Sequence, residues 1–199
     1  MKLRTIALIS SALTATLFLA GCSTGASQDG VNTDATSAPS AAESASFNLD
    51  DQMFATMMIP HHQQAVEMAD LVLSKSDIDE RVVELAQQIK AAQDPEIAIM
   101  EGWLTSWGVD YDSSDSSGMD GMGDGMMSDA DMDQLQQVEG SEASRLFLEQ
   151  MIEHHEGAIV MAQAELDDGE YPEALKLAEE IISAQTDEIA IMRAILDTL

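Results

Sequence analysis

Apolar residues recur every three or four positions in four segments of the chain, which is the spacing of one helix face. In the first half they are Ala65, Met68, Ala69, Val72 and Leu73, and then Val82, Leu85, Ile89 and Ala92. In the second half they are Ile159, Ala162 and Leu166, and then Leu175, Ala178, Ile181 and Ile182. This pattern predicts four long helices and an all-α fold.

Polar segments divide each half into two helices. Residues 74–79 separate the first pair, and residues 168–172 separate the second. In the second segment Gly169 suits the end of a helix, and Pro172 suits the first turn of the next one. Each half of the chain is therefore expected to form a helical hairpin.

A short extra helix is expected between the two hairpins, over Asp129 to Val138. Ser128 is a typical N-cap, and Gly140 is expected to end the helix. Pro60 and Pro95 instead fall inside long helices, where a proline costs about 3 kcal/mol. The second half has Glu and Asp at the equivalent positions, so we predict kinks in the first half and not breaks.

The two halves of the chain are copies of one another. Seven residues recur 93 positions later: Met58, Ile59, His61, His62, Ala65, Met68 and Ala69 return as Met151, Ile152, His154, His155, Ala158, Met161 and Ala162. The segment Glu96–Met100 returns unchanged as Glu188–Met192, at an offset of 92. A duplicated hairpin with a longer central crossover favours a four-helix bundle.

Composition sets the outer limits of the bundle. Residues 23–46 contain almost nothing apolar and are predicted to form a flexible tether. The domain is then expected to span residues 47–199. Within it, residues 47–108 form repeat one, residues 113–127 form a linker rich in Met, Gly and Asp, and residues 128–199 form repeat two.

Residues 1–22 have the features of an export signal. Lys2 and Arg4 precede a short apolar run, and the segment Leu19–Cys22 resembles the lipobox of bacterial lipoproteins. The run is too short for a spanning helix. We predict that the signal is cleaved and that Cys22 carries a lipid. This places the protein outside the cytoplasm, at the outer face of the cell membrane or in the periplasm or outer membrane, with the lipid as its only membrane contact.

The chain is strongly acidic, with 37 acidic residues against eight basic ones and a formal net charge of −29. Such a charge repels phosphates, so it argues against nucleic acid and anionic lipid surfaces as partners. It raises the local concentration of cations.

All four histidines lie in two doublets with matching surroundings: His61, His62, His154 and His155. A methionine, Met58 or Met151, stands three residues before the first histidine of its doublet and four before the second. On a helix these positions share a face. Imidazole and thioether groups form a soft ligand set that suits copper and above all Cu(I). The doublets therefore predict a copper site that binds Cu(I) first, with Cu(II) or silver at the same place.

Further side chains share these helix faces. Additional candidate thioether ligands, each of which could also be ordinary core filling, are Met57, Met68, Met161, Met100 and Met192. Four side chains are candidates for orienting an imidazole through a hydrogen bond to the ring nitrogen that does not bind the metal. They are Glu96, Glu188, Gln93 and Gln185. The linker is expected to be flexible and unburied, and to capture metal through Met119, Met122, Met126 and Met127.

The position of Met58 and Met151 narrows the choice of metal. Carboxylate-bridged di-iron bundles place Glu three residues before the ligand histidine, and zinc favours Cys, Asp or a third histidine. Three alternatives stay open: a zinc or iron carrier, a metal-independent surface interaction domain, and an oxidase-type metalloenzyme. The last needs inward carboxylates, for which the candidates are Glu67, Glu96, Glu156 and Glu188. The pattern leaves undecided whether the doublets form one site or two, and which oligomer forms.

From about Phe47 to Leu199 the chain resembles the domain-of-unknown-function 305 family of exported bacterial proteins. The motifs Met-Ile-Pro-His-His-Gln-Gln-Ala and Met-Ile-Glu-His-His-Glu-Gly-Ala, and the two Glu-Ile-Ala-Ile-Met segments, carry the resemblance. It implies a ferritin-like four-helix bundle linked to copper binding and tolerance, with the four histidines as ligands. We expect a protein that sequesters or delivers copper, with a copper-handling protein as a candidate partner, and no catalysis.

Overall fold

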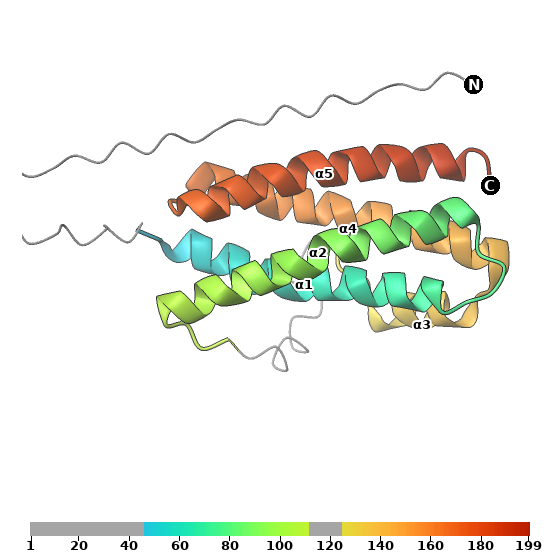
Figure 1. Ribbon diagram of the computed structural model, residues 1–199, viewed down its shortest axis with the longest axis horizontal. Helices are drawn as coiled ribbons and strands as arrows, with labels where there is room; N and C mark the ends of the chain where they lie inside the picture. Colours follow the sequence, from blue (N-terminus) through green and yellow to red (C-terminus); the bar gives the residue numbers. More distant parts are fainter. Residues whose placement is uncertain (1–45, 112–124) are drawn as a thin grey trace, which may run out of the picture. The chain divides into compact units, whose positions relative to one another are not determined.

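A computed structural model describes residues 46–111 and 125–199, and in these residues the regular structure is all helical (Figure 1). The five helices are α1 (Leu49–Leu73), α2 (Glu80–Trp107), α3 (Asp129–Gln137), α4 (Gly140–Asp168) and α5 (Pro172–Leu196). Within these residues, no helix combines the length and apolarity that crossing a membrane requires.

The four long helices form two hairpins that pack on one another. Helix α1 lies along α2, α4 lies along α5, and α1 and α4 make the main contact between the hairpins. The short helix α3 packs against both α1 and α4. The predicted bundle of two duplicated hairpins, with an extra helix in the crossover, is confirmed, and it is ferritin-like.

Polar caps set the helix ends. Asn48 and Asp51 form a capping box at the start of α1, and Ser128 and Asp131 form another at the start of α3. The prediction that Gly140 ends α3 is wrong. Helix α3 already ends before Val138, and Gly140, with φ at +57°, begins α4. The positive φ suits a glycine at this sharp change of direction.

Both prolines lie inside unbroken helices, as predicted. Helix α1 runs for 25 residues through Pro60, and α2 runs for 28 residues through Pro95. Packing of the apolar faces therefore outweighs the cost of an interior proline.

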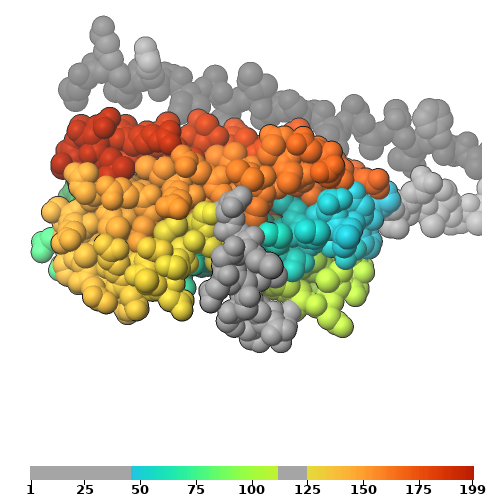
Figure 2. Space-filling view, turned by 180° about the vertical axis from the view of Figure 1, so that it is seen from behind, coloured from blue at the N-terminus to red at the C-terminus, as the bar shows by residue number. Residues whose placement is uncertain are grey.

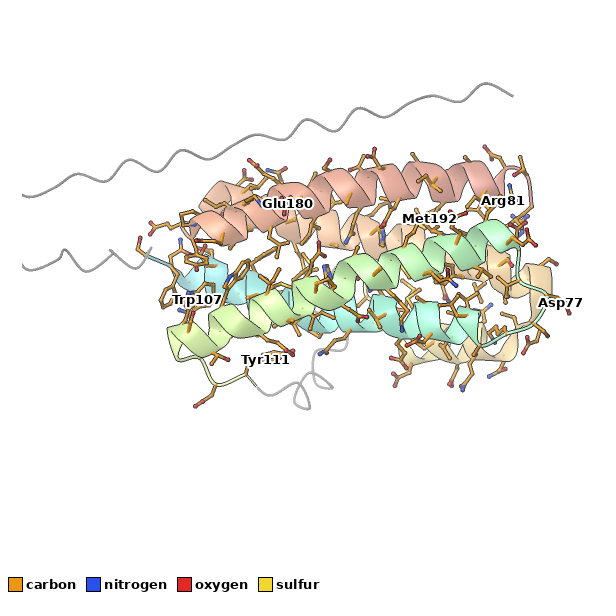
Figure 3. All side chains as sticks on the ribbon, in the orientation of Figure 1. Asp77, Arg81, Trp107, Tyr111, Glu180 and Met192 are labelled. Atoms are coloured by element: carbon orange, nitrogen blue, oxygen red, sulfur yellow. The ribbon has the colours of Figure 1, made fainter. Side chains whose placement is uncertain are left out.

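The buried core consists of two clusters, which we name after one methionine in each. The Met151 cluster is built around Ala65–Val72 of α1 and Phe147–Met151 of α4, and it includes Met192 of α5 (Figure 3). The Met58 cluster is built around Phe54–Ile59 of α1 and Ala158–Ala162 of α4. Along each helix, the histidine doublet therefore stands between the two clusters.

The ends of the bundle differ in chemistry. Trp107 and Tyr111 lie at one end, and Asp77 and Arg81 lie at the other (Figure 3). The ring of Trp107 stacks on Phe47 at 4.7 Å between centroids. This contact fixes the start of the described chain to the end of α2.

Candidate metal centre

The two histidine doublets meet in the middle of the bundle. His61 and His62 on α1, and His154 and His155 on α4, are all at most 1% exposed. The ring centroids of His61 and His154 are 3.7 Å apart. We call these four residues the histidine layer, because they separate the Met58 cluster from the Met151 cluster.

The second histidine of each doublet forms a hydrogen bond with a glutamate of the neighbouring helix. The Nε2 atom of His62 lies 2.9 Å from Oε2 of Glu96 on α2, and Nε2 of His155 lies 2.6 Å from Oε2 of Glu188 on α5. Because a carboxylate only accepts hydrogen bonds, each Nε2–H is the donor. In the neutral imidazole the lone pair then lies on Nδ1.

These Nδ1 atoms are placed as a ligand atom would be. Both are buried, and neither has a hydrogen-bond partner in the described part of the chain. A buried nitrogen without a partner is costly, while a ring held by a carboxylate through its other nitrogen is the usual arrangement of a metal-binding histidine. The donor set therefore fits a metal ion.

The pKa of His154 is lowered well below the usual histidine value. Burial is the main cause, and the proximity of His61, then His155 and His62, adds to it. A low pKa keeps the ring neutral, so that the lone pair of its unprotonated nitrogen remains available to a Lewis acid.

The thioethers that the pattern singled out lie on both sides of the histidine layer. Met58 and Met100 are fully buried in the Met58 cluster, with Met161 packed against it. Their equivalents Met151, Met192 and Met68 are fully buried in the Met151 cluster. Each of these methionines in one cluster therefore has its repeat equivalent in the other cluster. Each cluster contains methionines from both repeats. Met57 is half-buried on α1.

The two candidate glutamines are equivalent in position and in surroundings. Gln93 and Gln185 are 3% and 4% exposed, one helical turn before Glu96 and Glu188. Their Oε1 atoms have no hydrogen-bond partner among residues 46–111 and 125–199. In each hairpin, the helix that carries the imidazole-binding glutamate therefore also carries a buried amide oxygen.

The four carboxylates that an oxidase would need do not gather. Glu67 is exposed, and so is Glu156, which binds Arg193 on the surface at 2.6 Å. Only Glu96 and Glu188 reach the histidines. Over the described residues, no group of three or more His, Cys, Asp or Glu side chains is arranged to hold a metal ion.

The linker methionines differ from one another. Met119 and Met122 lie outside the described residues, as does Cys22. Met126 is half-buried, and Met127 is 8% exposed and belongs to the Met151 cluster. The expectation of an unburied methionine is therefore wrong for Met127, because its backbone is bound by Gln64. Sequence reasoning missed Gln64, although it stands where the second repeat has Gly157.

Comparison with known proteins identifies the family. Residues 51–196 match the profile of a domain of unknown function, DUF305. A DUF305 protein from Streptomyces coelicolor is 35% identical, with a TM-score of 0.68 over 74% of this chain and 92% of that one. A DUF305 fragment from Deinococcus radiodurans is 31% identical, with a TM-score of 0.65 over 76% and 98%.

CopM in its Cu(I)-bound form is 34% identical, with a TM-score of 0.59 over 72% of this chain and 93% of that one. CopM has also been solved in Cu(II)-bound and silver-bound forms. No curated protein matches the chain. The family profile covers nearly all of the described bundle, and the chain belongs to the DUF305 family.

Proposed function

We propose that this chain is an exported, lipid-anchored protein that binds copper through histidine and methionine, for sequestration, tolerance or delivery. The observation that carries the proposal is the matched pair of buried Nδ1 atoms on His62 and His155. Each belongs to a ring whose other nitrogen is held by a glutamate. Buried lone pairs in an apolar core are costly until a donor or a cation meets them.

The side chains around the histidine layer favour a soft ion. Thioethers of Met58 and Met151 lie one helical turn before the histidines, fully buried. Imidazole and thioether together suit Cu(I), with silver and Cu(II) at the same place. The nearby carboxylates, Glu96 and Glu188, each already accept a hydrogen bond from an imidazole.

The relatives of known structure support the same proposal. CopM, with a third of its residues identical to this chain, is known with Cu(I), Cu(II) and silver bound. In our proposal Glu96 and Glu188 orient the rings of His62 and His155, and the two methionine clusters keep water from the ion. A copper-handling protein would receive the ion by ligand exchange.

Competitive Cu(I) titration against a chromogenic chelator tests the proposal. The wild-type protein is compared with two variants, His61/His62→Ala and His154/His155→Ala. We expect both to lose affinity or stoichiometry, because each removes half of the histidine layer. Gln163→Ala is the control, since Gln163 is exposed on α4, away from the histidine layer, and its side chain donates a hydrogen bond to Asp167. Wild-type binding in both doublet variants would contradict the proposal, and tighter zinc or iron binding would favour a different carrier.

We further propose that residues 1–22 are the export signal, that Cys22 is lipid-bearing, and that residues 23–46 tether the metal-binding domain of residues 47–199. The lipobox-like sequence supports this reading. In cells of the source organism, Cys22→Ser is expected to move the protein from the membrane fraction to the soluble fraction. Retention of the variant in the membrane fraction, with unchanged palmitate labelling, would contradict it.

A further inference from the structure

The crossover between the hairpins is fastened at the histidine layer. We call Gly125, Met126 and Met127 the crossover anchor. The side-chain amide of Gln64 makes two hydrogen bonds with Met127: its Nε2 donates to the Met127 carbonyl at 2.8 Å, and its Oε1 accepts from the Met127 N–H at 2.7 Å. Gln64 follows His61 and His62 on α1, so the anchor lies beside the layer.

The other end of the anchor rests on α4. Gly125 has φ at +89°, and a Cβ added there would lie 2.6 Å from the carbonyl oxygen of Glu153 and 2.9 Å from Cα of Gly157. Backbone touches backbone at this point, around the turn that carries His154 and His155. Seen from behind, the yellow region that includes α3 lies against the orange α4 (Figure 2).

The two repeats differ at the positions that hold the anchor. Gln64 of repeat one and Gly157 of repeat two are equivalent in the duplication, 93 residues apart. Gln64 supplies the hydrogen bonds, and Gly157 leaves room for the backbone of Gly125. The crossover contributes Met127 to the Met151 cluster. Among the described residues, it contributes no methionine to the Met58 cluster.

We propose that the crossover anchor makes the two sides of the histidine layer unequal, and that Met126 and Met127 pass incoming Cu(I) to the Met151 side first. Gln64 is the positioning residue that holds both thioethers in place. The inference rests on the proposed function. In each step a Cu–S bond to one thioether forms as a bond to the previous ligand breaks, and copper stays Cu(I) with no proton moved.

The physical reason is proximity. The half-buried Met126 is accessible from solvent, while its neighbour Met127 is already part of the buried Met151 cluster. A ligand fixed next to its acceptor acts at a high effective concentration, which speeds the second step without a new contact in the final complex. Loss of the anchor should therefore slow loading and leave equilibrium affinity unchanged.

Stopped-flow transfer of Cu(I) from its bicinchoninate complex to the full-length protein tests this inference. We expect two phases in the wild type, one for each side of the layer. Gln64→Ala should slow the fast phase about tenfold, with the slow phase and the total copper bound unchanged. Met126→Leu should act in the same direction while keeping both hydrogen bonds of Gln64. Met53→Leu, at an exposed methionine of α1, and Gln163→Ala are the matched controls.

Hydrogen exchange of the Met127 amide gives a second readout that needs no metal. Gln64→Ala should abolish its protection, while Gln64→Glu, which keeps the acceptor, should retain part of it and part of the fast phase. A single phase in the wild type, or a wild-type fast phase in both Gln64→Ala and Met126→Leu, overturns the inference and leaves copper binding intact. Absence of any Cu(I) binding by the wild type overturns the proposed function itself.

Discussion

The imidazole rings of His61 and His154 meet where α1 and α4 pack together, with their centroids 3.7 Å apart. His154 and its chain neighbour His155 are farther apart, at 6.4 Å. The closer contact therefore joins the two repeats, and the doublets lie in one layer. Any change to one ring alters the surroundings of the other.

The first prediction concerns the glutamates behind the rings. Glu96→Gln should weaken Cu(I) binding about 10- to 100-fold, because the amide orients the ring of His62 less strongly than the carboxylate does. Glu188→Gln should have the same effect through His155. Chelator competition measures both changes.

Glu101→Gln is the matched control for these variants, because Glu101 is exposed on the same helix as Glu96. Equal affinities for wild type, Glu96→Gln and Glu188→Gln would show that the carboxylates do not orient ligands. A double variant weaker than either single one would indicate that both sides of the layer bind copper.

The second prediction concerns the effect of metal on stability. An ion that binds only the folded chain adds about 2.7 kcal/mol to the free energy of unfolding at one hundred times its dissociation constant. For a domain of this size that corresponds to a rise in Tm of about 5–10 °C. Thermal unfolding with and without Ag(I), a redox-inert soft ion, measures the shift. Mg²⁺ at the same concentration should give none, and an equal shift with both ions would argue against a soft site.

Part of this architecture could be predicted from the sequence because the relevant signals are local and repeated. Helical spacing predicts the four long helices, and the duplication predicts that His61 and His154 occupy equivalent positions. The Glu96 and Glu188 contacts follow from the same logic, since each hairpin repeats the other. Similar arguments place Met58 and its equivalent beside the histidines.

The crossover anchor and its contact with α4 could not be predicted in this way. A segment rich in glycine, methionine and aspartate has the composition of a loop, and nothing local shows that Gln64 binds the backbone of Met127. The buried carboxyl pair of Asp51 and Glu165 was also missed. Its members lie on different helices, and only tertiary packing brings them together.

The third prediction concerns that carboxyl pair. Burial raises the pKa of Glu165 to about 8, and the proximity of Asp51 and then of Asp50 adds to the shift. Asp51 itself accepts the backbone N–H groups of Glu170 and Tyr171. These two bonds tie the start of α1 to the turn after α4, where Glu165 is buried.

Since the pKa of Glu165 is raised on folding, the folded chain retains a proton that the unfolded chain releases. Its contribution is complete below the unfolded pKa of about 4.5 and is lost as pH rises through about 8. We expect the Tm of the metal-free protein to fall as pH rises from about 4.5 to about 8, and this contribution to level off above that pH. Glu165→Gln, which stays neutral at every pH, should flatten this slope. An equal fall of Tm with pH in the wild type and in Glu165→Gln would show that Glu165 does not cause the pH dependence.

The last prediction compares two glycines. Gly125→Ala should destabilise the protein by about 1–3 kcal/mol, because the added Cβ meets backbone atoms of α4 that cannot move aside cheaply and because φ is positive. Gly102→Ala should instead stabilise it by about 0.5–1 kcal/mol, since Gly102 lies inside α2 with nothing within 4 Å of the added atom. Urea unfolding of the metal-free protein measures both. If Gly125→Ala unfolds at the same urea concentration as the wild type, the anchor does not contact α4 in solution. If Gly125→Ala is destabilised while Gly102→Ala is stabilised, the loss of stability comes from the backbone contact between Gly125 and α4.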